Sequence, residues 1–215
     1  MTQWVSEPAG GRERGPVALA RAWFEVITNP RAFFRAAVVP GDQAPGLVFA
    51  AAVVLVAAGT RLLTRPGGYP VLGGRPIASG LLWLALIVLL VTPAALHLTA
   101  AVQTLVLVPF VDDRAGVSET VQVIAYATAP CVLAGLPVPG VVVVCCGYGT
   151  VLFVLGVATV HEVSLAQAAL MAAIPAALVF GYGFGGVAAG TAVADALLSS
   201  LDRWIDGTVA AAVGA

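Results

Sequence analysis

The chain carries very little charge. Only 10% of its 215 residues are Asp, Glu, Lys or Arg, whereas soluble domains carry about 25%, so the chain cannot cover a globule with a solvated surface. Lysine is absent, and all ten basic residues are arginines. The formal net charge is −1. Because binding to nucleic acid requires a clustered positive field, nucleic acid is not expected as a partner.

Recognisable catalytic motifs are also absent. The sequence has no Gly-x-Ser-x-Gly, phosphate loop, His-Glu-x-x-His or dinucleotide fingerprint. Its three cysteines, Cys131, Cys145 and Cys146, lie in apolar stretches, where an odd number of thiols does not indicate a disulfide framework. We interpret them as small buried hydrophobes. We therefore expect no enzyme activity, no catalytic residue, and no cofactor-binding or metal-binding residue.

Long apolar runs fill the rest of the chain. Hydrophobic residues make up 60% of it and the mean hydropathy is +1.00. Several runs exceed the roughly 20 residues that cross a hydrocarbon core of about 30 Å, and none alternates as a membrane β-strand would. The first forty residues contain three glutamates and five arginines, so we expect no signal peptide. Insertion would then depend on the first membrane helix.

The fold class predicted is all-α: a polytopic membrane helix bundle with five transmembrane helices plus amphipathic N- and C-terminal helices. The expected division is a disordered tail over 1–15, an interfacial amphipathic segment over 16–44, a transmembrane domain over 45–193 and an amphipathic tail over 194–215. The five crossings are expected at about 45–63, 80–108, 120–136, 140–160 and 165–193.

Prolines and polar caps set these boundaries. Pro93 lies within the second crossing and predicts a bend. Pro130 interrupts the third, and the turn at residues 137–140 allows only an antiparallel hairpin between the third and the fourth. Ser164 and Gln167 have capping-box spacing at the start of the fifth.

Both ends of the chain combine aromatic and charged residues at helical spacing. Two short helices are expected, from Pro16 to about Thr28 and from Pro30 to about Val38. Aromatic and arginine residues on short helices are typical of the membrane interface; the alternative is a soluble cap packed on the bundle. We favour the interface, with five anchors, one of them in the C-terminal tail: Trp23, Phe24, Phe33, Phe34 and Trp204.

Two further patterns bear on assembly and orientation. The fifth crossing contains small-xxx-small spacings that allow helix backbones to approach closely, at Gly181, Gly185, Gly186 and Gly190. With the N-terminus inside and five crossings, six arginines lie on cytoplasmic segments and four on outside segments. This bias favours a multi-pass protein of the cell membrane with a cytoplasmic N-terminus and an outside C-terminus.

The central stretch resembles the Yip1 domain family, in its prokaryotic type. The order and spacing of a set of residues over about Trp23 to Ile174 carry this resemblance: Asn29-Pro30-Arg31-Ala32-Phe33-Phe34, Gly116-Val117-Ser118-Glu119-Thr120, Ala125-Tyr126, Ala129-Pro130, Pro137 with Gly140, Tyr148, Leu155-Gly156, His161, Ser164 and Ala168. The resemblance implies a five-helix membrane bundle with a cytoplasmic N-terminus. Eukaryotic relatives are linked to vesicle traffic and small prenylated GTPases. We do not carry that role over, because the N-terminal segment is short and has no docking domain.

A few polar residues at the membrane boundaries are the candidates for function. They form a candidate polar cluster: His97, Gln103, Glu119, His161 and Glu162. The structural alternative is that the acids lie at the headgroups and the histidines hydrogen-bond helix ends. An enzyme would require Glu119, His161 and Glu162 to converge on a metal.

Two hypotheses on function remain. The first is a non-enzymatic scaffold that organises lipid or binds partners. The expected partners are the lipid bilayer, other membrane proteins or a second copy of the chain. The second hypothesis is a small transporter or channel whose polar groups (His97, Gln103, Glu119, His161) line a path through the bundle.

Overall fold

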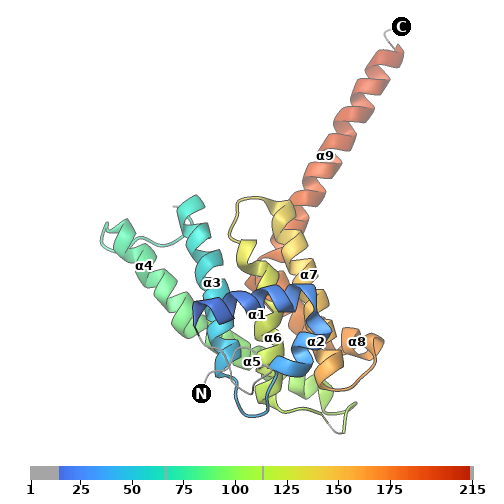
Figure 1. Ribbon diagram of the computed structural model, residues 1–215. Helices are drawn as coiled ribbons and strands as arrows, with labels where there is room; N and C mark the ends of the chain where they lie inside the picture. Colours follow the sequence, from blue (N-terminus) through green and yellow to red (C-terminus); the bar gives the residue numbers. More distant parts are fainter. Residues whose placement is uncertain (1–14, 66, 113, 214–215) are drawn as a thin grey trace.

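The computed structural model describes residues 15–65, 67–112 and 114–213, so the tail expected over 1–15 lies almost wholly outside the described residues. Every regular element of the described part is a helix. In chain order they are α1 (Pro16–Thr28), α2 (Pro30–Ala37), α3 (Ala44–Thr64), α4 (Pro76–Leu86), η1 (Ile87–Val91), α5 (Thr92–Leu107), α6 (Val117–Ala127), η2 (Ala129–Leu133), α7 (Pro139–Val160), α8 (Leu165–Ala176), η3 (Ala177–Gly183) and α9 (Gly186–Val213). Figure 1 shows α3, α6 and α7 side by side, with α1 and α2 lying across them.

Four helical segments of the described chain are long and apolar enough to span a bilayer. They are α3, the continuous run α4–η1–α5, α7, and α8 with η3. The predicted third crossing over 120–136 is not among them. It consists of α6, with eleven residues, followed by the 3-10 helix η2, which contains Pro130.

The position of α6 explains why a broken helix is tolerated there. Every residue from Thr120 to Cys131 is buried, because α3, α5 and α7 surround this segment. In a bilayer, irregular backbone is stable only where protein shields it from lipid. Burial within the bundle therefore shields the irregular backbone of this stretch. The interruption predicted at Pro130 occurs as the change from α6 to η2, and the count of five crossings is not confirmed.

The predicted fifth crossing also ends earlier than expected. Its helical run stops at Gly183 rather than at residue 193, and Gly185 adopts a left-handed backbone with φ of 83°. A new helix, α9, begins at Gly186 and continues through the predicted amphipathic tail. In Figure 1 this helix extends far from the bundle. The apolar residues after Gly185 therefore belong to α9.

The bend predicted in the second crossing occurs as a π-helical turn. Pro93 has no N–H to offer the preceding turn, and η1 lies directly before it. The Thr92 hydroxyl donates to the carbonyl oxygen of Ile87 at 2.8 Å, which provides a partner for a backbone group within the widened turn. Figure 1 shows α4 diverging from α3 above this point.

An aromatic cluster joins the N-terminal helices to the bundle. Tyr126 of α6 makes edge-on contacts with Phe33 and Phe49, at ring-centroid distances of 4.9 and 5.1 Å. Phe34 is also buried and contacts Gly156 of α7. The interpretation of Phe33 and Phe34 as interfacial anchors was therefore wrong, since both side chains face protein.

Helix α1 likewise packs on the bundle. Trp23 donates from Nε1 to the carbonyl oxygen of Ala129 at 2.8 Å, and the Tyr148 hydroxyl donates to the carbonyl oxygen of Ile27. This arrangement agrees better with the alternative of a cap packed on the bundle than with the favoured prediction of a helix at the membrane interface. The exposed Phe24 remains a predicted anchor, and so does Trp204, which is exposed on α9.

Only one of the four predicted packing glycines lies at a close helix approach. A Cβ at Gly186 would lie 2.6 Å from the carbonyl oxygen of Phe180 and 3.0 Å from the Cβ of Cys146. Gly185 forms the turn between η3 and α9. A Cβ at Gly190 would meet no atom within 4 Å, and a Cβ at Gly181 would meet only Val187, which lies just across that turn. The other close approaches occur at glycines that the spacing pattern did not select: Gly46, Gly135, Gly149 and Gly156.

Candidate functional site

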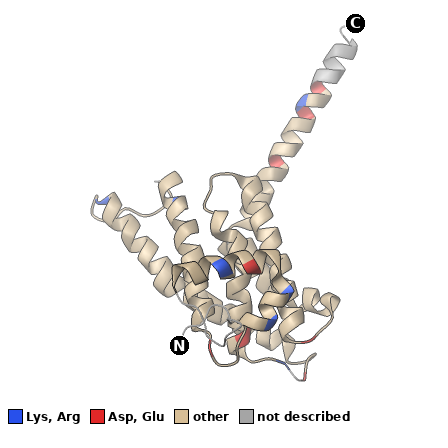
Figure 2. Cartoon of the chain, in the orientation of Figure 1, with Lys and Arg blue, Asp and Glu red and all other residues tan. Residues whose placement is uncertain are grey.

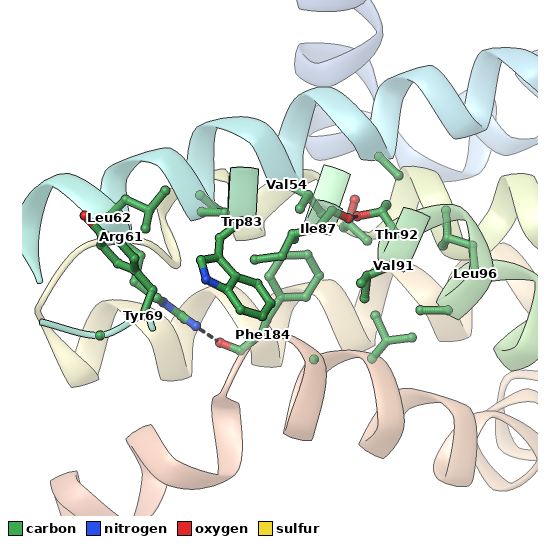
Figure 3. Close-up of a pocket in the computed structure, with 18 of the residues that line it drawn as sticks. Val54, Arg61, Leu62, Tyr69, Trp83, Ile87, Val91, Thr92, Leu96 and Phe184 are labelled. Atoms are coloured by element: carbon green, nitrogen blue, oxygen red, sulfur yellow. Dashed lines mark hydrogen bonds between the residues drawn. The ribbon is translucent and has the colours of Figure 1, made fainter. Parts of the chain in front are cut away.

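A cavity of about 620 Å³ lies between α3, the α4–η1–α5 run and η3. This volume is in the range of ligand sites, about 300–1,000 Å³. Figure 3 shows Arg61 and Tyr69 at one end and Leu96 at the other, with Trp83 and Ile87 between them. Most lining residues are aliphatic or aromatic, and the wall is completed by Thr92, Thr99 and Thr128.

One face of α3 forms a long wall of the cavity. Its lining residues recur at helical spacing: Ala50, Val54, Ala57, Ala58, Arg61, Leu62 and Arg65. Ala50 and Arg61 are eleven residues apart, which corresponds to about 16 Å along a helix axis. One leaflet is about 15 Å deep, half of a hydrocarbon core of about 30 Å. The cavity therefore runs inward from the end of α3 over a length close to the depth of one leaflet.

Both π-helical segments of the chain's described part line this cavity. Ile87 and Val91 belong to η1, while Leu178 and Val179 belong to η3. A π-turn widens a helix locally, and such turns are frequent at functional sites. The two widened segments face the same volume from opposite sides, next to Pro93 and Pro175 respectively.

The loop after α3 folds over the mouth of the cavity. Trp83 donates from Nε1 to the carbonyl oxygen of Pro70 at 3.0 Å. The Tyr69 hydroxyl donates to the carbonyl oxygen of Pro76 at 3.3 Å, and its ring lies against Gly80. These contacts fix two amphipathic aromatic side chains beside the arginine end of the cavity.

The charge at this mouth is positive. Arg61 donates from Nη2 to the carbonyl oxygens of Ala134 and Phe184, both at 3.4 Å, and the second contact is the dashed line in Figure 3. Arg65 follows one turn later on the same face. Among the described residues that line the cavity, none is acidic. Figure 2 shows charges on α1, α2 and α9 and at the ends of the bundle.

The predicted polar cluster does not form one site. His97 is exposed on α5 and its Nδ1 lies 2.7 Å from the carbonyl oxygen of Pro93, on its own helix. Gln103 is fully buried, and its amide has no hydrogen-bond partner within the described chain. Neither residue lines the cavity on α3. Within the described ranges, no group of three His, Cys, Asp or Glu residues could hold a metal ion, so the convergence required for an enzyme is not found there.

His161 and Glu119 do come together at the opposite end of the bundle. His161 caps α7 and is buried, and its Nδ1 accepts a hydrogen bond from the Ala115 N–H at 3.2 Å. Burial lowers the pKa of His161 to about 4; Glu119 opposes this shift and Arg114 adds to it. Exposed Glu162, with φ of 53°, lies in a separate hollow with Arg31 and Arg35.

Acid is expected to destabilise the protein through His161. Its pKa is lower in the folded protein than the ordinary 6.5, so the unfolded chain binds more protons between pH 6.5 and about 4, and stability falls as pH falls through that window. His161→Gln should flatten this loss in thermal-shift measurements in detergent. His97→Gln, at an exposed position, should leave it unchanged; an equal pH slope in wild type and His161→Gln would contradict the assignment.

A family model for the Yip1 domain matches residues 24–187 of the chain. This match covers more than half of the 215 residues. The chain belongs to the Yip1 domain family. Neither the curated proteins nor the solved structures contain a match to it. It is a multi-pass membrane protein of helical architecture, as the resemblance and the hydropathy both predicted.

The residues that carry the family pattern hold this Yip1 bundle together. Tyr126 lies in the aromatic cluster, and the Tyr148 hydroxyl donates a hydrogen bond to α1. Gly156 has no side chain, which leaves space for Phe34 and Val123. Ser164 and Gln167 form the predicted capping box, with the Gln167 N–H donating to Ser164 Oγ at 3.3 Å. These residues of the pattern therefore contribute packing and helix-capping contacts.

Sequence reasoning missed the cavity. The sequence analysis did not select Arg61, Arg65, Tyr69 or Trp83 as candidate site residues. The available signal was two arginines four residues apart at a helix end, with Tyr69 in the following loop and Trp83 in the next helix.

Proposed function

We propose that this Yip1 protein is a non-enzymatic, membrane-organising scaffold that holds a lipid chain in the cavity between α3, η1 and η3. We further propose that it resides in the cell membrane with its N-terminus in the cytoplasm and its C-terminus outside, an orientation supported by the arginine bias. Other membrane proteins or a second copy would bind its outer surfaces.

The cavity is the observation that carries this proposal. Its walls are largely apolar and about as long as one leaflet is deep. Lining residues such as Val91 and Leu178 are 48% and 43% exposed, so the cavity opens at the surface of a bundle that lipid surrounds. An apolar chain from the bilayer matches these walls better than water or a polar solute does.

The geometry favours a transporter less. That hypothesis requires a polar path, but neither of the two cavities described here is lined by His97, Gln103, Glu119 or His161. The transporter hypothesis would regain support if liposomes containing the protein showed solute flux that His97→Ala abolishes.

Lipid retention tests the proposal. Native mass spectrometry of the full chain purified in mild detergent is expected to show one phospholipid retained per chain. Ala58→Phe adds a ring to the cavity wall and should reduce the retained fraction by about tenfold, a loss equivalent to about 1.4 kcal/mol. The cause is that the ring occupies the volume proposed for the lipid chain.

The matched control is Leu55→Phe, an exposed position of α3 outside the cavity. This variant should retain lipid as the wild type does. Equal retention in all three proteins, or no retained lipid in the wild type, would contradict the proposal.

A further inference from the structure

We propose that the lipid held in this cavity is an anionic phospholipid, with its phosphate bound between Arg61 and Arg65 and one acyl chain lying along α3. This inference rests on the proposed function and names the chemical class of the ligand. Three observations support it: the two arginines, the aromatic mouth formed by Tyr69 and Trp83, and the length of the cavity.

Arg61 has donors to spare. Its two hydrogen bonds both come from Nη2, are long at 3.4 Å, and end on neutral carbonyl oxygens. A guanidinium has five N–H donors in a planar fork that matches phosphate oxygens. The bonds to Ala134 and Phe184 fix the position of the guanidinium beside the cavity, while the remaining donors are available to an anion.

Arg65 supplies a second positive charge on the same face. Arg61 lies in the last turn of α3 and Arg65 directly follows the helix, and both line the cavity. The described part of the lining contains no carboxylate that could neutralise them. Both arginines are exposed at the end of a membrane helix, where they attract anions, and a phosphate provides several oxygen acceptors for both.

The aromatic mouth places this end of the cavity at headgroup depth. Tyr69 and Trp83 flank the arginine end, and their polar atoms bond carbonyl oxygens of the loop and of the start of α4. Such side chains are enriched where hydrocarbon meets headgroups. A lipid whose phosphate lay at Arg61 would therefore have its headgroup at the correct level.

The length of the cavity matches the acyl chain of the proposed phospholipid. From Arg61, the apolar wall continues to Ala50 over about 16 Å, close to the depth of one leaflet. The widened turns η1 and η3 line this apolar part. A soluble phosphate compound would leave that wall empty, so the source of the anion is a phospholipid of the surrounding leaflet.

Competition between two lipids tests the inference. The full chain, purified in detergent, is titrated with equimolar phosphatidylglycerol and phosphatidylcholine, and the bound lipid is measured by native mass spectrometry. Both lipids offer a phosphate, but the trimethylammonium group of phosphatidylcholine would lie beside two arginines and be repelled by them. The wild type should therefore prefer phosphatidylglycerol by about tenfold or more. Arg61→Gln/Arg65→Gln should lose the preference while still retaining neutral lipid.

Arg75→Gln is the matched control, because Arg75 is an exposed arginine at the start of α4 that does not line the cavity. It should keep the wild-type preference. Lipid retained by the wild type without preference would overturn this inference and leave the proposed function standing, whereas no retained lipid would contradict both. Equal loss of preference in Arg75→Gln would also overturn it, because a general effect of protein charge would then explain the result.

Discussion

Gly135→Ala is expected to destabilise the protein more than any other single methyl addition considered. A Cβ at Gly135 would overlap the carbonyl oxygen of Ala57 and lie 2.8 Å from the Cβ of Thr60, so α3 and the turn before α7 would have to separate. Overpacking against backbone costs about 3 kcal/mol, or a loss of roughly 6–12 °C in Tm for a chain of this size. Thermal unfolding in detergent, followed by circular dichroism, measures the change.

Gly140→Ala is the control for this prediction. Gly140 lies five residues further on, at the start of α7, and a Cβ there would meet no atom within 4 Å. Because alanine is a better helix former than glycine, this variant should be as stable as the wild type or slightly more so. Equal Tm values for the two variants would show that the turn does not approach α3 as closely as described.

Gln122→Leu is expected to have the second-largest effect. The Gln122 amide donates from Nε2 to the carbonyl oxygen of Val39 at 2.7 Å, and its Oε1 accepts from the Val39 N–H at 3.1 Å. This pair of hydrogen bonds joins the linker after α2 to Gln122, a fully buried residue of α6. Leucine removes both bonds and leaves the backbone of Val39 without its partners, at a cost of about 3 kcal/mol. Tm should fall by roughly 6–12 °C.

The same variant should also loosen the linker. Limited proteolysis at residues 38–43 should become faster in Gln122→Leu than in the wild type, because two hydrogen bonds that anchor the linker are lost. Gln43→Leu is the control, since Gln43 precedes α3 and its side chain makes no capping bond; its stability should change by less than about 0.5 kcal/mol. Unchanged stability and cleavage in Gln122→Leu would contradict the role of this amide.

The parts of the fold that hydropathy specifies could be predicted from the sequence. Long uncharged runs identified α3, α7 and the bent run through Pro93, because only lipid or protein can surround such segments. Local chemistry was equally readable at Ser164, where the capping box forms as its spacing predicts. The helices that begin at Pro16 and Pro30 follow from the position of each proline at the first helical residue.

The rest depends on tertiary contacts that hydropathy does not encode. The interruption at Pro130 was readable from the sequence, but the complete burial of residues 120–131 between α3, α5 and α7 was not, because it depends on which helices surround the segment. The same dependence misplaced Phe33 and Phe34, whose aromatic rings suit either an interface or a core. Spacing alone selected Gly186 correctly but not the other three glycines, since a close approach depends on which helix lies opposite.

The candidate site was hidden for a related reason. Its residues come from segments as distant in sequence as Ala50 and Phe184, and each residue has an ordinary role within its own segment. Only the packing of α3 against η1 and η3 shows that the two arginines and two aromatic residues share one cavity. By contrast, His97 and Gln103 attracted attention as rare polar residues, but they lie outside that cavity.

The most direct test of the central claim is a cryo-EM structure of the full chain in nanodiscs containing phosphatidylglycerol with dibrominated acyl chains. The account predicts that α3, α4–η1–α5, α7 and α8–η3 span the membrane around the buried α6–η2 segment, which connects the end of α5 to the start of α7. It also predicts bromine density between α3 and η3 and phosphate density beside Arg61. Bromine density confined to the outer surface of the bundle, with the cavity closed by side chains, would contradict it.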